Sequence, residues 1–254
     1  MGQLVSTWTP VHGLRVHAYR SVGVSAPGTP TVVLVHGVAV SSRYLVPLAE
    51  HLAPRARIYL PDLPGYGRSD RPPERDLDVP ELADALLAWI ERVGLERPHL
   101  IGNSFGCQVI ADLAARHLDR VGRLVLQGPT FDPHARSFWR QAFRWLAVLP
   151  FERFSEGVVL ARDVWDVGPR RAMDLVGKAL RDPIEQKLRL ILAETLVVRG
   201  SQDAIVPQEW ADEAVRLLPN GQLVVIDGAA HTINYSQPDR LVQVIWPFLI
   251  APDL

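Results

Sequence analysis

The chain has 254 residues, of which 48% are hydrophobic, the fraction expected of one globular domain with a full core. Its 27 basic and 28 acidic residues give a net charge of -1, which argues against nucleic acid or an anionic membrane as a partner. One cysteine allows no internal disulfide. The sequence shows neither a secretory signal nor the ~20 consecutive apolar residues that span a bilayer, so we predict a cytoplasmic protein.

Short apolar segments that recur along the chain predict strands. Near the N-terminus, Leu14, Val16 and Ala18 alternate with polar residues, which is typical of an antiparallel strand, here paired with Val5–Thr9. The later segments are apolar without interruption, as in parallel strands that are buried on both faces. They are Val32–Val35, Ile58–Leu60, Leu100–Ile101, Leu124–Leu126, Leu196–Val198 and Leu223–Ile226.

Segments with helical periodicity separate these strands. The predicted helices are Tyr44–Leu52, Pro80–Val93, Ser104–His117, Pro207–Leu218 and Pro238–Leu249. Because strands that alternate with helices are joined by right-handed crossovers, the chain is predicted to be an α/β protein with a doubly wound, mostly parallel sheet.

One long segment interrupts the alternation. Residues 131–192 show helical patterns and no convincing strand, and they are too many for an ordinary loop. We therefore predict a core domain formed by residues 1–130 and 193–254, with a helical cap of residues 131–192 inserted after the sixth strand.

The first chemical motif is Gly102-Asn103-Ser104-Phe105-Gly106, which matches G-x-S-x-G. It lies between a predicted strand and a predicted helix, where a sharp turn would project the Ser104 hydroxyl outward as a nucleophile. The structural alternative is that Ser104 only caps the helix, since serine is a preferred N-cap residue. The position between strand and helix favours the nucleophile.

Further motifs complete a resemblance to the α/β-hydrolase superfamily, in its serine-nucleophile, esterase- or lipase-like branch. His36-Gly37 follows a predicted strand, and residues 62–69 read Asp-Leu-Pro-Gly-Tyr-Gly-Arg-Ser, which resembles the family's D-x-P-G-x-G-x-S loop. Gly200-Ser201-Gln202-Asp203 and Gly228-Ala229-Ala230-His231 are similar to the loops that carry the family's acid and histidine. Haloalkane dehalogenases and epoxide hydrolases resemble this chain but have Asp at the place of Ser104.

A serine nucleophile needs a base, and the base needs an acceptor that fixes its tautomer. His231 follows the last predicted strand, so it should reach the same carboxyl edge of the sheet as Ser104. Asp203 follows the preceding strand and is the predicted acid, and the order Ser, Asp, His is the one expected for this fold. Asp132 is the rival acid, because it follows an earlier strand at the same edge.

Backbone donors should stabilise the oxyanion that forms during acyl transfer. The N–H of Phe105, directly after the nucleophile, is one predicted donor. By resemblance, the N–H of Val38, after His36-Gly37, is the other.

The aromatic side chains Phe138, Trp139, Phe143 and Trp145 lie in the predicted cap. They are candidate substrate-binding residues for a small to medium, largely apolar substrate. The alternative is that they only pack the core.

These features predict a serine hydrolase that cleaves a small-molecule carboxylic ester, lactone or thioester through an acyl-enzyme. Cofactor-free C–C bond hydrolysis is an alternative, although many such hydrolases have Trp after the histidine, where this chain has Thr232. A non-hydrolytic or ligand-binding role is a further alternative, since fold does not fix function. No metal-ligand spacing or dinucleotide motif is present, so neither metal nor cofactor is predicted. The sequence does not specify the oligomeric state.

Overall fold

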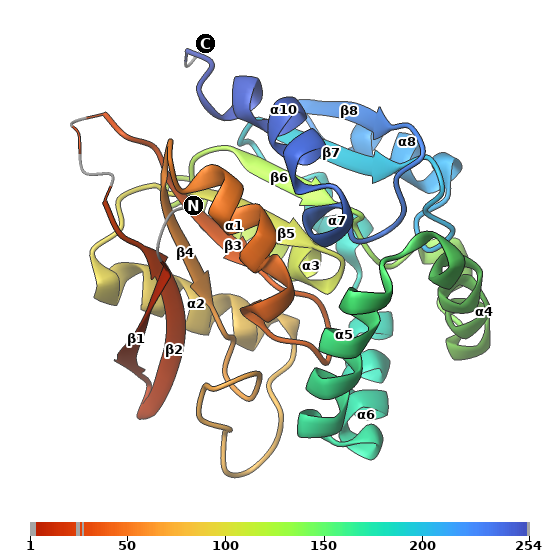
Figure 1. The fold of residues 1–254 in the computed structure, drawn as a ribbon, viewed down its shortest axis with the longest axis horizontal. Helices are drawn as coiled ribbons and strands as arrows, with labels where there is room; N and C mark the ends of the chain where they lie inside the picture. The colour runs from red at the N-terminus through yellow and green to blue at the C-terminus, as the bar shows by residue number, and fades with distance from the viewer. Residues whose placement is uncertain (1–3, 24–25, 27, 253–254) are drawn as a thin grey trace.

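The computed structural model describes residues 4–23, 26 and 28–252. Within these residues, eight strands form one sheet in the order β1-β2-β4-β3-β5-β6-β7-β8 (Figure 1). The pairs β1·β2 and β2·β4 are antiparallel, and the others are parallel. The strands are β1 (Leu4–Val11), β2 (Leu14–Ser21), β3 (Thr31–Val35), β4 (Arg57–Pro61), β5 (His99–Asn103), β6 (Leu124–Gln127), β7 (Thr195–Gly200) and β8 (Gly221–Ile226). The predicted doubly wound, mostly parallel sheet is confirmed.

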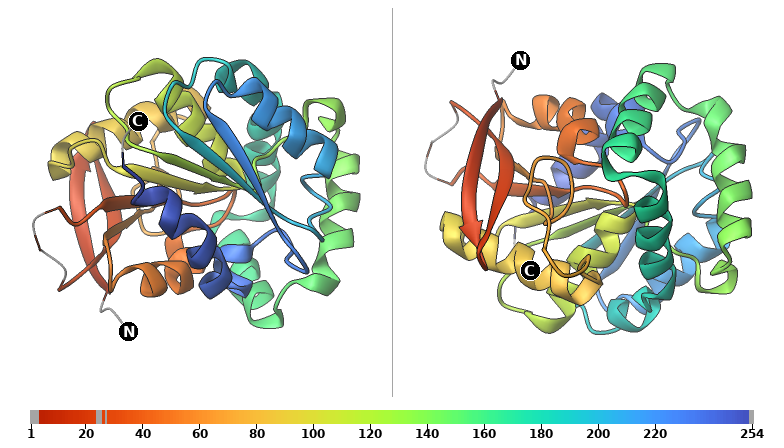
Figure 2. Two further views of the ribbon diagram at one scale, coloured as in Figure 1. Left: turned by 90° about the horizontal axis from the view of Figure 1, so that it is seen from above. Right: turned by 90° about the horizontal axis from the view of Figure 1, so that it is seen from below.

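Helices cover both faces of the sheet, as Figure 2 shows. One apolar cluster joins the sheet to α2 (Val79–Val93), α3 (Phe105–Arg116) and α8 (Gln208–Leu217). The opposite cluster joins it to α1 (Val46–Leu52) and α10 (Pro238–Leu249). Both faces of the inner strands β3, β5, β6 and β7 are largely buried, which explains their continuous apolar sequences, whereas β8 is an edge strand and is only partly buried.

Helix α2 illustrates how local sequence sets an element's ends. Asp78 accepts a hydrogen bond from the Glu81 N–H at 3.1 Å, and the Glu81 carboxylate accepts one from the Asp78 N–H at 2.9 Å. This capping box satisfies donors that the first helical turn leaves free. Gly94 ends the helix with φ of 75°, a left-handed conformation that favours glycine.

A run of helices separates β6 from β7. It comprises η2 (Pro133–Ala135), α4 (Phe138–Val148), η3 (Leu149–Phe151), α5 (Phe154–Val167), α6 (Pro169–Arg181) and α7 (Ile184–Leu188). We call these elements the helical insertion. Its helices α4, α5 and α6, in green to teal, stand beyond the ends to which the parallel strands point (Figures 1 and 2). The insertion therefore lies at the carboxyl edge of the sheet, where α/β proteins carry their sites.

The loop after β4 is organised around Asp62. Its carboxylate accepts hydrogen bonds from the N–H groups of Ser42 and Arg68, at 2.8 and 3.0 Å, and pairs with Nδ1 of His17 at 2.9 Å. Burial alone would raise the pKa of Asp62, but these partners lower it to about 2. The motif that begins at Asp62 thus ties three segments of the core together.

Among the described residues, no helix is long and apolar enough to cross a bilayer.

Candidate active site

Ser104 occupies a strained turn between β5 and α3. Its φ and ψ are 56° and -120°, a combination that L-residues rarely adopt. The turn brings α3 so close to β3 that a Cβ on Gly106 would lie 2.3 Å from the Val35 carbonyl oxygen. The Ser104 N–H donates to the Gln127 carbonyl at 3.0 Å, which fixes the turn to β6. The sequence places a serine where the backbone projects its side chain from the sheet edge.

His231 and Asp203 form a buried pair at the same edge. Nδ1 of His231 lies 2.8 Å from Oδ2 of Asp203, and each residue exposes only 1% of its surface. The other carboxylate oxygen of Asp203 accepts hydrogen bonds from the N–H groups of Ile205 and Val206, at 2.9 and 3.1 Å. The acid is therefore held in one orientation and fixes the proton of His231 on Nδ1.

The pKa of His231 reflects two opposing effects. Burial lowers the pKa, because it disfavours the imidazolium, but the carboxylate of Asp203 and, to a smaller extent, that of Glu152 favour the charged form. The net result is a pKa raised above the ordinary histidine value. A proton accepted by His231 is thus stabilised.

Nε2 of His231 is available for proton transfer. It is buried and has no hydrogen-bond partner among the described residues, and the Ser104 hydroxyl has none there either. A hydrogen bond between Ser104 and His231 is therefore not formed in this structure. Such bonds are commonly long in unliganded enzymes and shorten when substrate is present.

The two predicted oxyanion donors are likewise unengaged. Within the described chain, the backbone N–H groups of Val38 and Phe105 donate to no backbone or side-chain acceptor. Their neighbour Gly37 is fixed, because its N–H donates to the Tyr44 hydroxyl at 2.7 Å, and this hydroxyl donates to Oδ1 of Asn103 at 2.7 Å. Tyr44 thereby joins the loop after β3 to the turn that carries Ser104.

The rival acid Asp132 is committed elsewhere. One oxygen accepts a hydrogen bond from the His134 N–H at 2.9 Å, and the other pairs with the Arg144 guanidinium at 2.8 Å. The carboxylate that contacts His231 is that of Asp203, at 2.8 Å. The geometry thus favours Asp203 as the partner of His231.

Two residues near His231 were not singled out from the sequence. A Cβ on Gly128, where φ is 60°, would lie 2.9 Å from Cε1 of His231 and 3.4 Å from Asp203. Gly128 therefore makes room for the imidazole. The Gln127 amide donates to the His231 carbonyl at 2.7 Å. A glycine directly after β6 is the sequence signal that could have indicated this close approach.

The four candidate aromatic residues lie in different surroundings. The Trp145 ring packs edge-on against the His231 ring, with centroids 6.2 Å apart, and 37% of Trp145 is exposed. Phe138 contacts Trp139, whereas Trp139 and Phe143 are each 71% exposed. Of the four, Trp145 is the residue that the structure brings to the candidate active site.

Glu152 is a further residue that sequence patterns did not indicate. It lies between η3 and α5, and one of its oxygens accepts hydrogen bonds from the N–H groups of His231 and Thr232, at 2.8 and 2.9 Å. The Thr232 hydroxyl donates to the other oxygen at 2.5 Å. Because Glu152 is far from His231 along the chain, only the fold reveals the contact.

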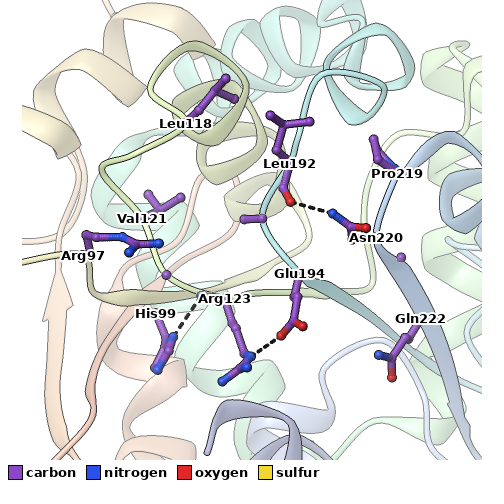
Figure 3. A pocket seen from close by; sticks show the side chains of 13 residues that line it. Arg97, His99, Leu118, Val121, Arg123, Leu192, Glu194, Pro219, Asn220 and Gln222 are labelled. Carbon is purple, nitrogen blue, oxygen red and sulfur yellow. Dashed lines mark hydrogen bonds and ion pairs between the residues drawn. The ribbon is translucent and has the colours of Figure 1, made fainter. Parts of the chain in front are cut away.

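A cavity of about 780 Å³ lies at the opposite edge of the sheet. Figure 3 shows that it is lined by residues at the amino ends of the strands, among them His99, Arg123 and Glu194. Arg123 pairs there with Glu194 and donates to carbonyl groups near the C-terminus. This cavity is separate from the Ser104 site.

In the part of the chain that the structure describes, no group of three His, Cys, Asp or Glu residues could hold a metal ion.

Comparison with known proteins identifies the family. The model of the alpha/beta hydrolase family matches residues 32–244. The chain belongs to this family. It is 25% identical to a 2-hydroxymuconate semialdehyde hydrolase from Pseudomonas putida, over 78% of each chain.

Solved structures with this fold include a thermophilic esterase from Thermogutta terrifontis. It has a TM-score of 0.78 and 24% identity, and the match covers 96% of this chain and 98% of that chain. The enol-lactonase from Burkholderia xenovorans has a TM-score of 0.77 and 21% identity, with coverage of 96% and 100%. Both likenesses establish the fold of this α/β hydrolase.

Proposed function

We propose that this α/β hydrolase is a serine hydrolase that cleaves a carboxylic ester, lactone or thioester through an acyl-enzyme. The observation that carries the proposal is the buried 2.8 Å pair of His231 and Asp203 at the sheet edge where Ser104 occupies its strained turn. A binding protein would not need a base and an acid at these places. Membership of a hydrolase family supports the same reading.

The proposed mechanism gives each of these groups one role. Ser104 Oγ attacks the substrate carbonyl while Nε2 of His231 accepts the serine proton, because Asp203 occupies Nδ1. The N–H groups of Val38 and Phe105 donate to the developing oxyanion. His231 then gives its proton to the leaving group. Water, activated by the same nitrogen, hydrolyses the acyl-enzyme.

The helical insertion is proposed to act as the predicted cap, with residues 131–192 covering a core of residues 1–130 and 193–254. Trp145 is its proposed substrate-binding side chain, since its ring contacts His231. An aromatic wall beside the base suits an apolar acyl or alcohol group of small to medium size. Phe138, Trp139 and Phe143 remain proposed binding residues only for substrates that extend over α4.

Labelling with a fluorophosphonate tests the nucleophile directly. The wild-type chain should be labelled at one site and Ser104→Ala should not, while Ser69→Ala, which changes another loop serine, should label normally. A panel of nitrophenyl esters, lactones and acyl thioesters then identifies the substrate class. If Ser104→Ala is labelled as well as the wild type, the serine mechanism is wrong.

A second candidate is hydrolysis of a C–C bond in a small-molecule substrate. The 25% identity to a 2-hydroxymuconate semialdehyde hydrolase favours it. Thr232 after the histidine argues against it, because Trp is frequent there in the C–C hydrolases that this chain resembles. Turnover of 2-hydroxymuconate semialdehyde with no activity on the ester panel would select this candidate.

A further inference from the structure

Helix α5 and the residues before it carry three acidic side chains that contact the core. Glu152 contacts the loop that bears His231. Asp163, eleven residues later, accepts hydrogen bonds from the N–H and hydroxyl of Ser41, at 2.8 and 2.7 Å, and from Arg43 at 2.6 Å. Glu156 lies between them and is fully buried. The acidic side of α5 therefore reaches from the histidine loop to the loop after β3.

The contact made by Glu152 is unusual because it engages the backbone of the proposed base itself. Its carboxylate accepts three hydrogen bonds, from the N–H of His231, the N–H of Thr232 and the Thr232 hydroxyl. Hydrogen bonds to a charged acceptor are roughly twice as strong as neutral ones. From the core side, Gln127 holds the His231 carbonyl. The peptide groups on both sides of the imidazole are thus fixed, one by the core and one by the helical insertion.

Glu156, four residues after Glu152, is a buried acidic residue. Neither of its carboxyl oxygens has a hydrogen-bond partner among the described residues. Burial first, and then the negative charge of Glu152, raise the pKa of Glu156 to about 8. The groups that interact with Glu156 come from three segments. Glu152 and Arg153 belong to the insertion, Thr232 to the loop that bears His231, and Tyr44 to the segment after β3. At neutral pH, Glu156 is therefore mostly a neutral acid.

We propose that Glu152 is a positioning residue that holds the His231 loop from the helical insertion, and that Glu156 controls this contact through its proton. When Glu156 carries its proton, Glu152 keeps its three hydrogen bonds to residues 231 and 232. When Glu156 ionises, its buried carboxylate repels that of Glu152 and the contact weakens. The position of the insertion and the alignment of the base are thereby linked. This inference rests on the proposed role of His231 and adds a residue from outside the core.

The first test compares Glu152→Gln with Thr232→Val. Glu152→Gln keeps the shape but removes the charge, so kcat should fall about tenfold or more, with KM little changed, because a displaced base is costly. The apparent pKa of the acidic limb of kcat/KM should also move down, since the charge of Glu152 favours the imidazolium. Thr232→Val removes a hydrogen bond but no charge, so kcat should fall without this shift.

Asp174→Asn is the matched control, because it removes a negative charge from an exposed position of α6. It should change neither kcat nor the acidic limb. An equal loss of activity in Glu152→Gln at every pH, with an unshifted limb, would show that Glu152 is only a structural residue. The pKa of His231 measured by NMR in the two chains gives the same comparison without turnover, so failure of the ester assay alone leaves the inference testable.

The second test addresses Glu156. The wild type should lose kcat above pH 8, whereas Glu156→Gln, which cannot ionise, should retain it. Stability gives a reading independent of catalysis. Because the pKa of Glu156 is raised in the folded state, its contribution is fully present below the ordinary glutamate pKa and is lost as the pH rises to about 8. The stability of the wild type relative to Glu156→Gln should therefore decline over that range and then level off. Parallel stability curves for the two chains would refute the role of Glu156.

Discussion

Asp203 and His231 lie in the core with 1% of their surface exposed, whereas Trp139 and Phe143, on α4 of the helical insertion, are 71% exposed. The core thus buries its polar groups in fixed hydrogen bonds, and the insertion leaves large apolar side chains in contact with solvent. Full burial of such a side chain stabilises a fold by about 1.5–3 kcal/mol. The exposed side chains of α4 contribute little of this stabilisation. The insertion is therefore not simply an extension of the core.

The core and the helical insertion also differ in the kind of contact that holds their helices in place. The sheet is covered by apolar helices, while α5 and α6 reach the core partly through charged groups such as Glu152, Asp163 and Arg171, which pairs with Asp76. Apolar burial responds little to pH, but carboxylate contacts weaken when a group gains or loses a proton. The insertion should therefore be the more pH-sensitive part of the molecule.

The largest expected effect comes from the core. Ser104→Ala should lower kcat by about 10⁶-fold on the preferred substrate, as loss of a nucleophile does in serine hydrolases whose triad acts as a unit. Thermal unfolding should stay close to that of the wild type, because only a hydroxyl is removed. Activity within tenfold of the wild type would exclude Ser104 as the nucleophile.

The next effect separates the two candidate acids. Asp203→Asn should lower kcat by about 10⁴-fold, since the amide favours the wrong imidazole tautomer. Asp132→Asn, which weakens the pair with Arg144, should lower it far less. Steady-state kinetics of both variants decide the assignment, and a greater loss in Asp132→Asn would reverse it.

A smaller loss is expected at the glycine beside the pair. Gly128→Ala places a Cβ 2.9 Å from the imidazole at a position where φ is 60°. The ring must move, so kcat should fall about 10²-fold, as for other misplaced catalytic groups. Gly157→Ala is a suitable control, because its added Cβ meets no atom within 4 Å. Equal kcat values for both variants would mean that the imidazole tolerates displacement.

The smallest effects distinguish the aromatic residues of α4. Trp145→Ala should change the ranking of substrates by kcat/KM, because Trp145 contacts His231. Trp139→Ala and Phe143→Ala should keep the ranking among esters too short to extend over α4, and each should change stability by no more than about 0.5 kcal/mol, as exposed sites do. Kinetics with short and long acyl esters, together with denaturant unfolding, test both statements. A changed ranking in Trp139→Ala but not in Trp145→Ala would move the proposed binding surface to the outer face of α4.

Local sequence patterns were enough to predict the sheet. Six continuous apolar segments and one alternating segment with its pairing partner predict eight strands, which agree with the eight in the described residues. The turn around Ser104 was also predictable, because glycines must flank a side chain projected from so tight a turn. Local patterns carry this information, since strand burial and turn geometry depend on adjacent residues.

The contacts between distant groups could not be predicted from the sequence and were seen only in the fold. The sequence left both Asp203 and Asp132 as possible acids, and the fold pairs His231 with Asp203 while Arg144 occupies Asp132. No sequence pattern indicated that Glu152 would contact the backbone of His231. Contacts between a loop of the sheet and an inserted helix depend on how the two pack. That packing has no periodicity in the sequence, because it joins residues nearly eighty positions apart.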